Sequence, residues 1–157
     1  MSIAIGLEEQ ARKHSVEVLL NYLADVHTLY FKTHGFHWNV TGQQFHALHA
    51  FFEEQYQALF EFVDEIAERI RALGAWAPLA ASELKARSSL QEMAPGKVPD
   101  AVSMLTLLRD DHEALCRRLR TGIDSVEDGG DQATADFLTE QLSQHEKMAW
   151  MLRSHLV

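Results

Sequence analysis

The chain has 157 residues, of which 46% are hydrophobic and 24% charged, and this composition is ordinary for one globular domain with its own core. Its formal net charge of −9, with histidine counted as neutral, argues against nucleic-acid binding through a general basic surface. No apolar run approaches a membrane span, the first seven residues lack the basic side chains of a signal peptide, and the single Cys116 fits a reducing compartment. We therefore expect a cytoplasmic protein made of one domain, residues 1–157.

Residues 7–40 are predicted to form one long helix. Apolar and histidine side chains recur along it every seven residues: Val16, Leu23, Tyr30 and His37 in one row, and Leu20, His27 and His34 in the next. His37 is therefore expected on the inward face, near the end of the helix. For His27 and His34 we favour packing and hydrogen bonding over metal binding.

A second long helix is predicted to follow and to end at Leu73, where Gly74 can stop it. Thr41 and Gln44 have the spacing of a capping box, in which each side chain satisfies a free backbone N–H group. Its core-facing stripe consists of Leu48, Phe52, Leu59, Val63, Ile66 and Ile70. The short connection makes the first two helices antiparallel neighbours.

Two pairs of potential metal ligands lie on this second helix, His49 with Glu53 and Asp64 with Glu68, each four residues apart and so on one face. With His49 set at zero, the other three fall at about 40°, 60° and 100°, whereas the core stripe centres near 290°. The ligands are therefore expected on the flank of a bundle. Imidazole and carboxylate together suit a first-row transition metal such as iron. The competing interpretation is that these carboxylates are ordinary solvated side chains.

The distance between the two pairs along the helix determines whether they can bind the same metal ion. His49 and Asp64 are 15 residues apart, about 22 Å along a helix. One metal ion bonds its ligands at about 2 Å, so a single helix cannot bring both pairs to it. Two copies of the helix, antiparallel about a two-fold axis, would place one pair opposite the other and create two equivalent sites. We therefore predict a metal site shared between two subunits.

The segment from Gly74 to Asp100 contains all three prolines and is predicted to be a crossover, with a short helix over residues 82–87. Such a crossover makes the second and third long helices parallel. The third is predicted to begin after Asp100 and end near Val126, and the fourth to run from an Asp131 cap to about His155. His112 lies in the apolar stripe of the third and is predicted to be a packed histidine.

Several common active-site patterns are missing from the sequence. No histidine has a glutamate three residues before it, the pattern of di-iron sites inside a single bundle. There is no HExxH motif, no paired CxxC and no glycine-rich phosphate loop. The sequence therefore disfavours ordinary ferritin, zinc protease and nucleotide-dependent enzyme functions.

One long motif resembles the Dps family, the DNA-binding proteins from starved cells or mini-ferritins, and the resemblance covers nearly the whole chain. The motif comprises His37-Trp38-Asn39-Val40-Thr41-Gly42, Phe45, Leu48-His49, Glu53 and Asp64-Glu65-Ile66-Ala67-Glu68-Arg69. The resemblance implies an all-α ferritin-like four-helix bundle, a hollow dodecamer, Fe(II) oxidation by hydrogen peroxide or oxygen, and storage of ferric mineral.

The resemblance also implies roles for individual residues. One subunit would supply His37, His49 and Glu53, its mate would supply Asp64 and Glu68, and Trp38 would lie near the iron. Many family members have Asp where Glu53 stands, so the role of this residue is the least defined. Acidic three-fold pores admitting Fe(II) would lie near Asp131, Asp136 and Glu140, although Asp136 and Glu140 also fit an ordinary solvated face.

Two other functions compete with iron oxidation. The first is a nucleoid-associated protein that binds and protects DNA, but the first fourteen residues offer only Arg12, Lys13 and His14 as basic groups, against Glu8 and Glu9. We therefore expect weak or absent DNA binding. The second is a plain helical assembly protein with incidental metal affinity.

Overall fold

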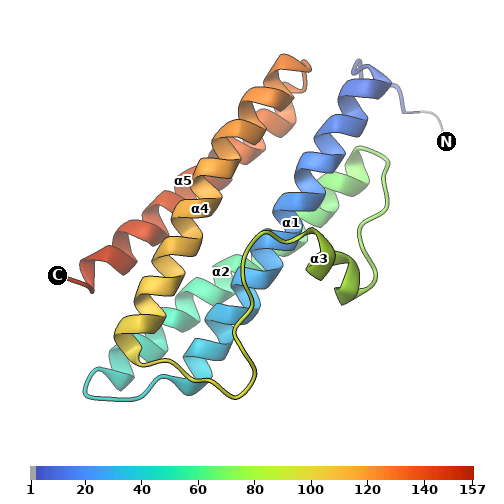
Figure 1. Ribbon diagram of the computed structural model, residues 1–157. Helices are drawn as coiled ribbons and strands as arrows, with labels where there is room; N and C mark the ends of the chain where they lie inside the picture. Colours follow the sequence, from blue (N-terminus) through green and yellow to red (C-terminus); the bar gives the residue numbers. More distant parts are fainter. Residues whose placement is uncertain (1–2) are drawn as a thin grey trace.

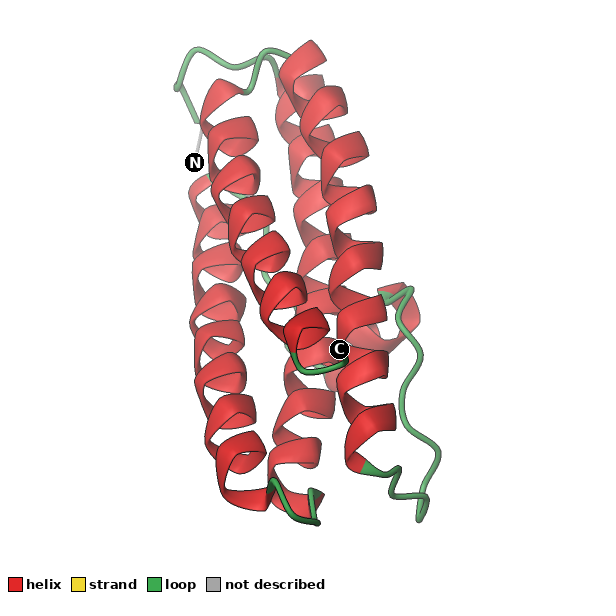
Figure 2. Ribbon diagram, turned by 90° about the vertical axis from the view of Figure 1, so that its left-hand side faces the viewer, coloured by secondary structure: helices red, strands yellow, loops and turns green. Residues whose placement is uncertain are grey.

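Four long helices and one short helix build the fold of this computed structural model, which describes residues 3–157 (Figure 1). The helices are α1 (Glu9–Asn39), α2 (Phe45–Ala72), α3 (Ala81–Arg87), α4 (Ala101–Asp128) and α5 (Gln132–Ser154). α1 packs on α2 and α4 packs on α5, and no strand occurs in the described part of the chain (Figure 2). The predicted all-α, ferritin-like four-helix bundle is confirmed.

The long crossover determines the direction of the second helical pair. After α2 the chain passes through α3 and runs back along α1 to the opposite end of the bundle, where α4 begins (Figure 1). α2 and α4 are consequently parallel, as predicted. The short helix was also predicted, and it begins one residue earlier than expected, at Ala81.

Three helix ends follow clear local sequence signals. Asp100 accepts a hydrogen bond from the backbone N–H of Ser103, and Asp131 accepts one from that of Thr134, so both predicted caps are confirmed. Gly74 follows α2 with a φ of +84°, a conformation that a side chain disfavours.

The predicted capping box at Thr41 is wrong. The residue in the N-cap position of α2 is Gln44, whose side chain makes no capping bond. The chain turns at Gly42, with a φ of +111°, and the backbone N–H of Phe45 donates to the Gly42 carbonyl at 3.1 Å. This turn shifts the start of the helix past Thr41, which lies exposed in the loop.

The hydrophobic core fills the space between the four long helices. The predicted stripe of α2 is buried except for Val63, which is partly exposed. The core of α4 and α5 includes Leu105, Leu108, Leu115, Leu138 and Leu152. The ligand candidates His49, Glu53, Asp64 and Glu68 all lie outside this core and are partly or fully exposed.

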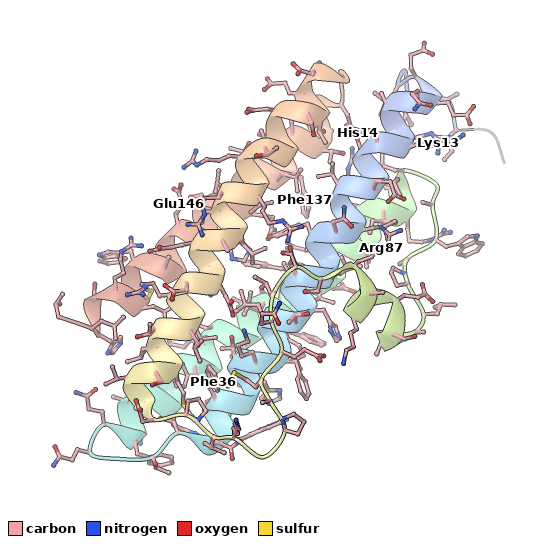
Figure 3. All side chains as sticks on the ribbon, in the orientation of Figure 1. Lys13, His14, Phe36, Arg87, Phe137 and Glu146 are labelled. Atoms are coloured by element: carbon pink, nitrogen blue, oxygen red, sulfur yellow. The ribbon has the colours of Figure 1, made fainter. Side chains whose placement is uncertain are left out.

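Asp25 of α1 anchors the crossover. Its buried carboxylate accepts hydrogen bonds from the Ser89 backbone N–H at 2.7 Å and the Ser88 hydroxyl at 3.0 Å, and it pairs with Arg118 of α4. At the end of α3, the half-buried Arg87 labelled in Figure 3 donates to Glu17 of α1 at 2.9 Å. One buried carboxylate thus joins the crossover to two long helices.

None of the helices within residues 3–157 combines the length and the hydropathy that crossing a lipid bilayer requires.

Candidate metal centre

His37 at the end of α1 and His49 in the second turn of α2 hold each other in place. The His37 Nδ1 lies 2.8 Å from the His49 carbonyl oxygen, and the His49 Nδ1 lies 2.8 Å from the His37 carbonyl oxygen. The two rings stack with centroids 3.8 Å apart and planes 18° apart. Because a carbonyl can only accept, both Nδ1 atoms carry the proton, and each Nε2 keeps a lone pair for a metal ion.

Glu53 lies one turn after His49 on the same side of α2 and is partly exposed. Tyr56 donates a long hydrogen bond of 3.4 Å to the Glu53 Oε1. The Tyr56 ring also meets His37 edge-on, with centroids 5.1 Å apart. Tyr56 therefore contacts two of the predicted ligands. Tyr56 was not among the predicted site residues, although its position three residues after Glu53 places it on the same helix face.

Asp64 and Glu68 lie further along α2, and both are exposed. Within residues 3–157, no three or more His, Cys, Asp or Glu side chains form a group that could hold a metal ion in one subunit. The structure therefore brings His37 and His49 together, places Glu53 beside them, and leaves Asp64 and Glu68 apart. The pairing of the two sets across a two-fold axis stays a prediction.

Comparisons with known proteins show the family and the fold of the chain. The model of the ferritin-like domain family matches residues 16–157. DNA protection during starvation protein 2 of Bacillus anthracis is 39% identical over 144 residues, which cover 92% of this chain and 97% of that protein. The chain belongs to the Dps family. A low temperature-induced protein of Nostoc sp. is 44% identical over 156 residues, covering 98% of this chain and 86% of that protein.

Solved Dps structures have the same fold as this family member. The Dps protein of Vibrio cholerae O1, described as a member of the ferritin-like diiron-carboxylate superfamily, matches with a TM-score of 0.93 and 31% identity, covering 99% of this chain and 97% of that one. DpsC of Streptomyces coelicolor matches with a TM-score of 0.95 and 27% identity, covering 100% and 91%.

A group of aromatic rings surrounds the histidine pair of this Dps-family protein. His34 lies between Trp38 and Tyr56, with ring centroids 4.1 Å and 4.0 Å away. Burial, together with the nearby His37, lowers the pKa of His34, so its ring is neutral at physiological pH. These contacts agree with the predicted packing role of His34. Trp38, predicted to lie near the iron, is 58% exposed.

The three residues predicted to lie near a pore differ in their surroundings. Asp136 and Glu140 are exposed on α5. Asp131 is buried, caps α5 and binds Arg69 of α2 at 3.2 Å. Burial alone would raise the pKa of Asp131, but hydrogen bonds from the Thr134 backbone N–H and hydroxyl and the charge of Arg69 hold it below its usual range. Within the subunit Asp131 is thus a helix cap, and a role at a pore stays a prediction for all three residues.

Proposed function

We propose that this Dps-family protein oxidises Fe(II), with hydrogen peroxide or oxygen as oxidant, at sites shared by two subunits. The ferric product would be stored as mineral inside a hollow shell of twelve subunits in the cytoplasm. The observation that carries the proposal is the reciprocal bonding of His37 and His49, which leaves both Nε2 atoms free for a metal ion. Fe(II) is the substrate and the ferric mineral is the cargo.

The surface around the histidine pair supports the sharing of the site. Two large aromatic side chains beside it are strongly exposed, Trp38 at 58% and Phe45 at 46%, and Phe60, 59% exposed, contacts Tyr30 further along the same two helices. Phe45 stacks on His49 with centroids 5.1 Å apart, so this apolar surface reaches the predicted ligands. Clustered exposed aromatic rings are typical of a surface that a partner covers. A second copy would cover them and would bring the missing carboxylates, Asp64 and Glu68.

The donor set suits the chemistry. Two neutral imidazoles and three carboxylates bind both Fe(II) and Fe(III), and the carboxylates balance the higher charge of the oxidised ion. A site between two surfaces also leaves coordination positions open for the oxidant. The acidic balance of the chain, −9, favours the accumulation of cations around and inside an assembly.

DNA protection is the second candidate, and the names of the relatives favour it. The described N-terminal segment does not support direct binding. Lys13 pairs with Glu9 at 2.5 Å, and Arg12 donates to the Leu73 carbonyl at 2.6 Å, so both cations are engaged within the subunit. Protection of DNA would then follow from the removal of Fe(II) and peroxide, which together generate hydroxyl radicals.

The proposed function is tested by removing the two carboxylates that a partner would supply. Asp64→Ala combined with Glu68→Ala should abolish rapid Fe(II) oxidation after peroxide is added, while the helical content stays unchanged because neither side chain is in the core. The matched control is Glu54→Ala with Glu61→Ala, which removes two exposed carboxylates from the same helix and should keep the wild-type rate. Wild-type oxidation by a well-folded Asp64/Glu68 variant would refute the assignment.

A further inference from the structure

A layer of polar side chains crosses the core of the bundle, and the proposed iron site does not use it. It contains a residue from each long helix: Tyr22 of α1, Glu65 of α2, His112 of α4, and Gln141 and His145 of α5. Tyr22, His112, Gln141 and His145 are buried, whereas Glu65 is exposed at the edge. Buried polar groups destabilise a core unless they are paired, so such a layer is expected only where its hydrogen bonds are well satisfied or useful.

The hydrogen bonds of this layer form a chain. The Tyr22 hydroxyl lies 2.8 Å from the His145 Nε2 and 3.2 Å from the Gln141 Oε1. The His145 Nδ1 lies 2.8 Å from the His112 Nδ1, and the Gln141 amide donates to the Glu65 carboxylate at 2.9 Å. The His112 Nε2, at the end of the chain, has no hydrogen-bond partner among the described residues. The chain therefore joins a phenol to two imidazoles in series.

Burial keeps these groups uncharged. It lowers the pKa of His145 to about 3 and that of His112 well below its usual range, and it raises the pKa of Tyr22 well above 10.0. At physiological pH the layer therefore holds an intact phenol facing neutral imidazoles. A neutral imidazole has one N–H and one free lone pair, so a proton that enters at the His145 Nε2 can be shared with His112 through the Nδ1 atoms.

The layer lies level with Asp64 and Glu68, the two carboxylates that this subunit would give to a shared iron site. α1 and α2 are antiparallel, and three contacts fix their register: His37 with His49, Tyr30 with Tyr56, and Arg12 with Leu73. The same register places Tyr22 level with Asp64. Glu65, which ends the chain through Gln141, is the sequence neighbour of Asp64. Tyr22 is thus separated from the Asp64 and Glu68 side of α2 by about the width of one helix, ~10 Å.

We propose that Tyr22 is a redox-active tyrosine that gives one electron to the oxidation reaction at the neighbouring iron site while His145 takes up its proton. This inference rests on the proposed function. An oxidised phenol is a far stronger acid than an imidazolium, so its proton leaves at once if a base is within hydrogen-bond distance. His145 is that base, and the short contact to His112 spreads the resulting positive charge over two rings.

The step balances with peroxide as the oxidant. Reduction of hydrogen peroxide to two water molecules consumes two electrons and two protons, whereas a single Fe(II) supplies one electron. Tyr22 supplies the second electron and becomes a neutral tyrosyl radical, its phenol proton moves to the His145 Nε2, and the two protons for water come from solvent. A later Fe(II) reduces the radical, and the proton returns from His145. No hydroxyl radical is released when iron arrives one ion at a time.

The other two tyrosines are less suited to this role. The Tyr30 hydroxyl lies 3.4 Å from the His34 Nδ1 and the Tyr56 hydroxyl donates to Glu53 at 3.4 Å, so both contacts are long. Both side chains are also partly exposed, whereas Tyr22 is 5% exposed. A buried radical is protected from coupling with other rings. Tyr22 therefore combines the shortest phenol–imidazole contact with the best protection.

The test uses the assembled protein, loaded with one Fe(II) per subunit and mixed with hydrogen peroxide. Electron paramagnetic resonance of rapidly frozen samples should show the signal of a tyrosyl radical. Ring-deuterated tyrosine, incorporated into the unmodified protein, should narrow this signal and so distinguish it from that of a radical on Trp38. Tyr22→Phe should remove the signal, and Tyr30→Phe, the matched control, should keep it. His145→Gln keeps a hydrogen-bond acceptor but cannot take up the proton, and it should strongly reduce the radical yield.

The outcomes separate this inference from the proposed function. If the wild-type protein fails to oxidise Fe(II), the proposed function fails. If it oxidises Fe(II) but forms no tyrosyl radical, or if the radical survives in Tyr22→Phe, the role of Tyr22 alone is overturned. If Tyr22→Phe fails to assemble, the deuterated wild-type protein and His145→Gln test the role of Tyr22 instead. An undiminished radical signal in His145→Gln would then count against the proposal.

Discussion

Histidine serves two different purposes in this chain, and the surroundings of each ring decide which. His37 and His49 bind each other's carbonyl oxygens through Nδ1 and keep Nε2 free at the flank of the bundle. His112 and His145 are fully buried and bind each other, so neither ring is offered to a metal ion at the surface. The first pair suits metal binding, and the second suits proton sharing.

Because His112 and His145 are buried, we expect the free energy of unfolding to fall in mild acid. The pKa of both rings is lowered in the folded state, so below the ordinary value of 6.5 the unfolded chain binds protons that the folded chain does not. The folded state is therefore most stable above pH 6.5, and this stability is lost progressively as the pH falls towards the pKa of His145 in the folded state, about 3. About one pH unit below 6.5 the loss should be about 1 kcal/mol for each ring.

Urea unfolding at a series of pH values measures this loss. His112→Gln with His145→Gln should flatten the dependence on pH, because glutamine does not titrate in this range. His46→Gln, which replaces an exposed histidine at the start of α2, should leave the slope as in the wild type. An equal slope in the wild type and the double variant would contradict this explanation.

At the scale of elements, the crossover is the feature that makes this bundle ferritin-like, because it makes α2 and α4 parallel. Its long path contains one short helix and few buried side chains, with Leu90 the exception at 9% exposed. The buried carboxylate of Asp25 therefore provides much of its attachment, through Ser88 and Ser89.

Removal of this anchor should loosen the crossover. Asp25→Ala leaves the Ser89 N–H without its partner and Arg118 without its counter-charge, and it should lower the free energy of unfolding by about 2–3 kcal/mol. Proteolysis within residues 74–100 should accelerate. Glu17→Ala is the matched control: it removes a carboxylate that joins α1 to Arg87, but this ion pair is exposed and should contribute less than about 1 kcal/mol. Equal losses in the two variants would show that Asp25 is not the main anchor.

At the scale of the whole molecule, the surface of one subunit is incomplete in two respects. Its predicted ligands form two separate sets on α1 and α2, and the exposed Trp38 and Phe45 lie beside one of them. The proposed second copy, related by a two-fold axis, would account for both features.

Sharing of the site predicts complementation between inactive subunits. Subunits with His49→Ala and subunits with Asp64→Ala should each be inactive alone. After dissociation, mixing and reassembly, a mixed dimer collects both changes in one site and leaves the other site intact, so part of the Fe(II) oxidation rate should return. Proven mixing without any recovery would favour a site built within one subunit.

DNA binding by the assembly should be weak and sensitive to salt. Each subunit contributes a formal charge of −9, and the basic groups of the described N-terminal segment are engaged in internal contacts. Affinity for DNA that depends on phosphate contacts falls steeply as salt rises. Gel shifts of plasmid near physiological salt, with a chelator present to remove bridging cations, should show no tight complex. A robust shift would make DNA binding a primary function.

The sequence by itself determined the helices, many of their ends and the exposed face of α2 on which the predicted ligands lie. These features depend on periods of three to seven residues and on caps such as Asp100 and Asp131, which act within one turn of the chain. The wrong prediction of a capping box at Thr41 also has a local cause. The chain turns at Gly42, so the residues that a capping box would need lie in this turn and not in the helix.

The tertiary structure alone decided the contacts on which the proposed chemistry rests. Three sets of contacts join different elements. They are the mutual hydrogen bonds of His37 and His49, the bonds that anchor the crossover to Asp25, and the hydrogen-bond chain from Tyr22 through His145 to His112. Tyr22 and His145 are separated by 123 positions, so no local period relates them. Only the packing of the four helices, which sets their register and buries one face of each, brings such residues within hydrogen-bond distance.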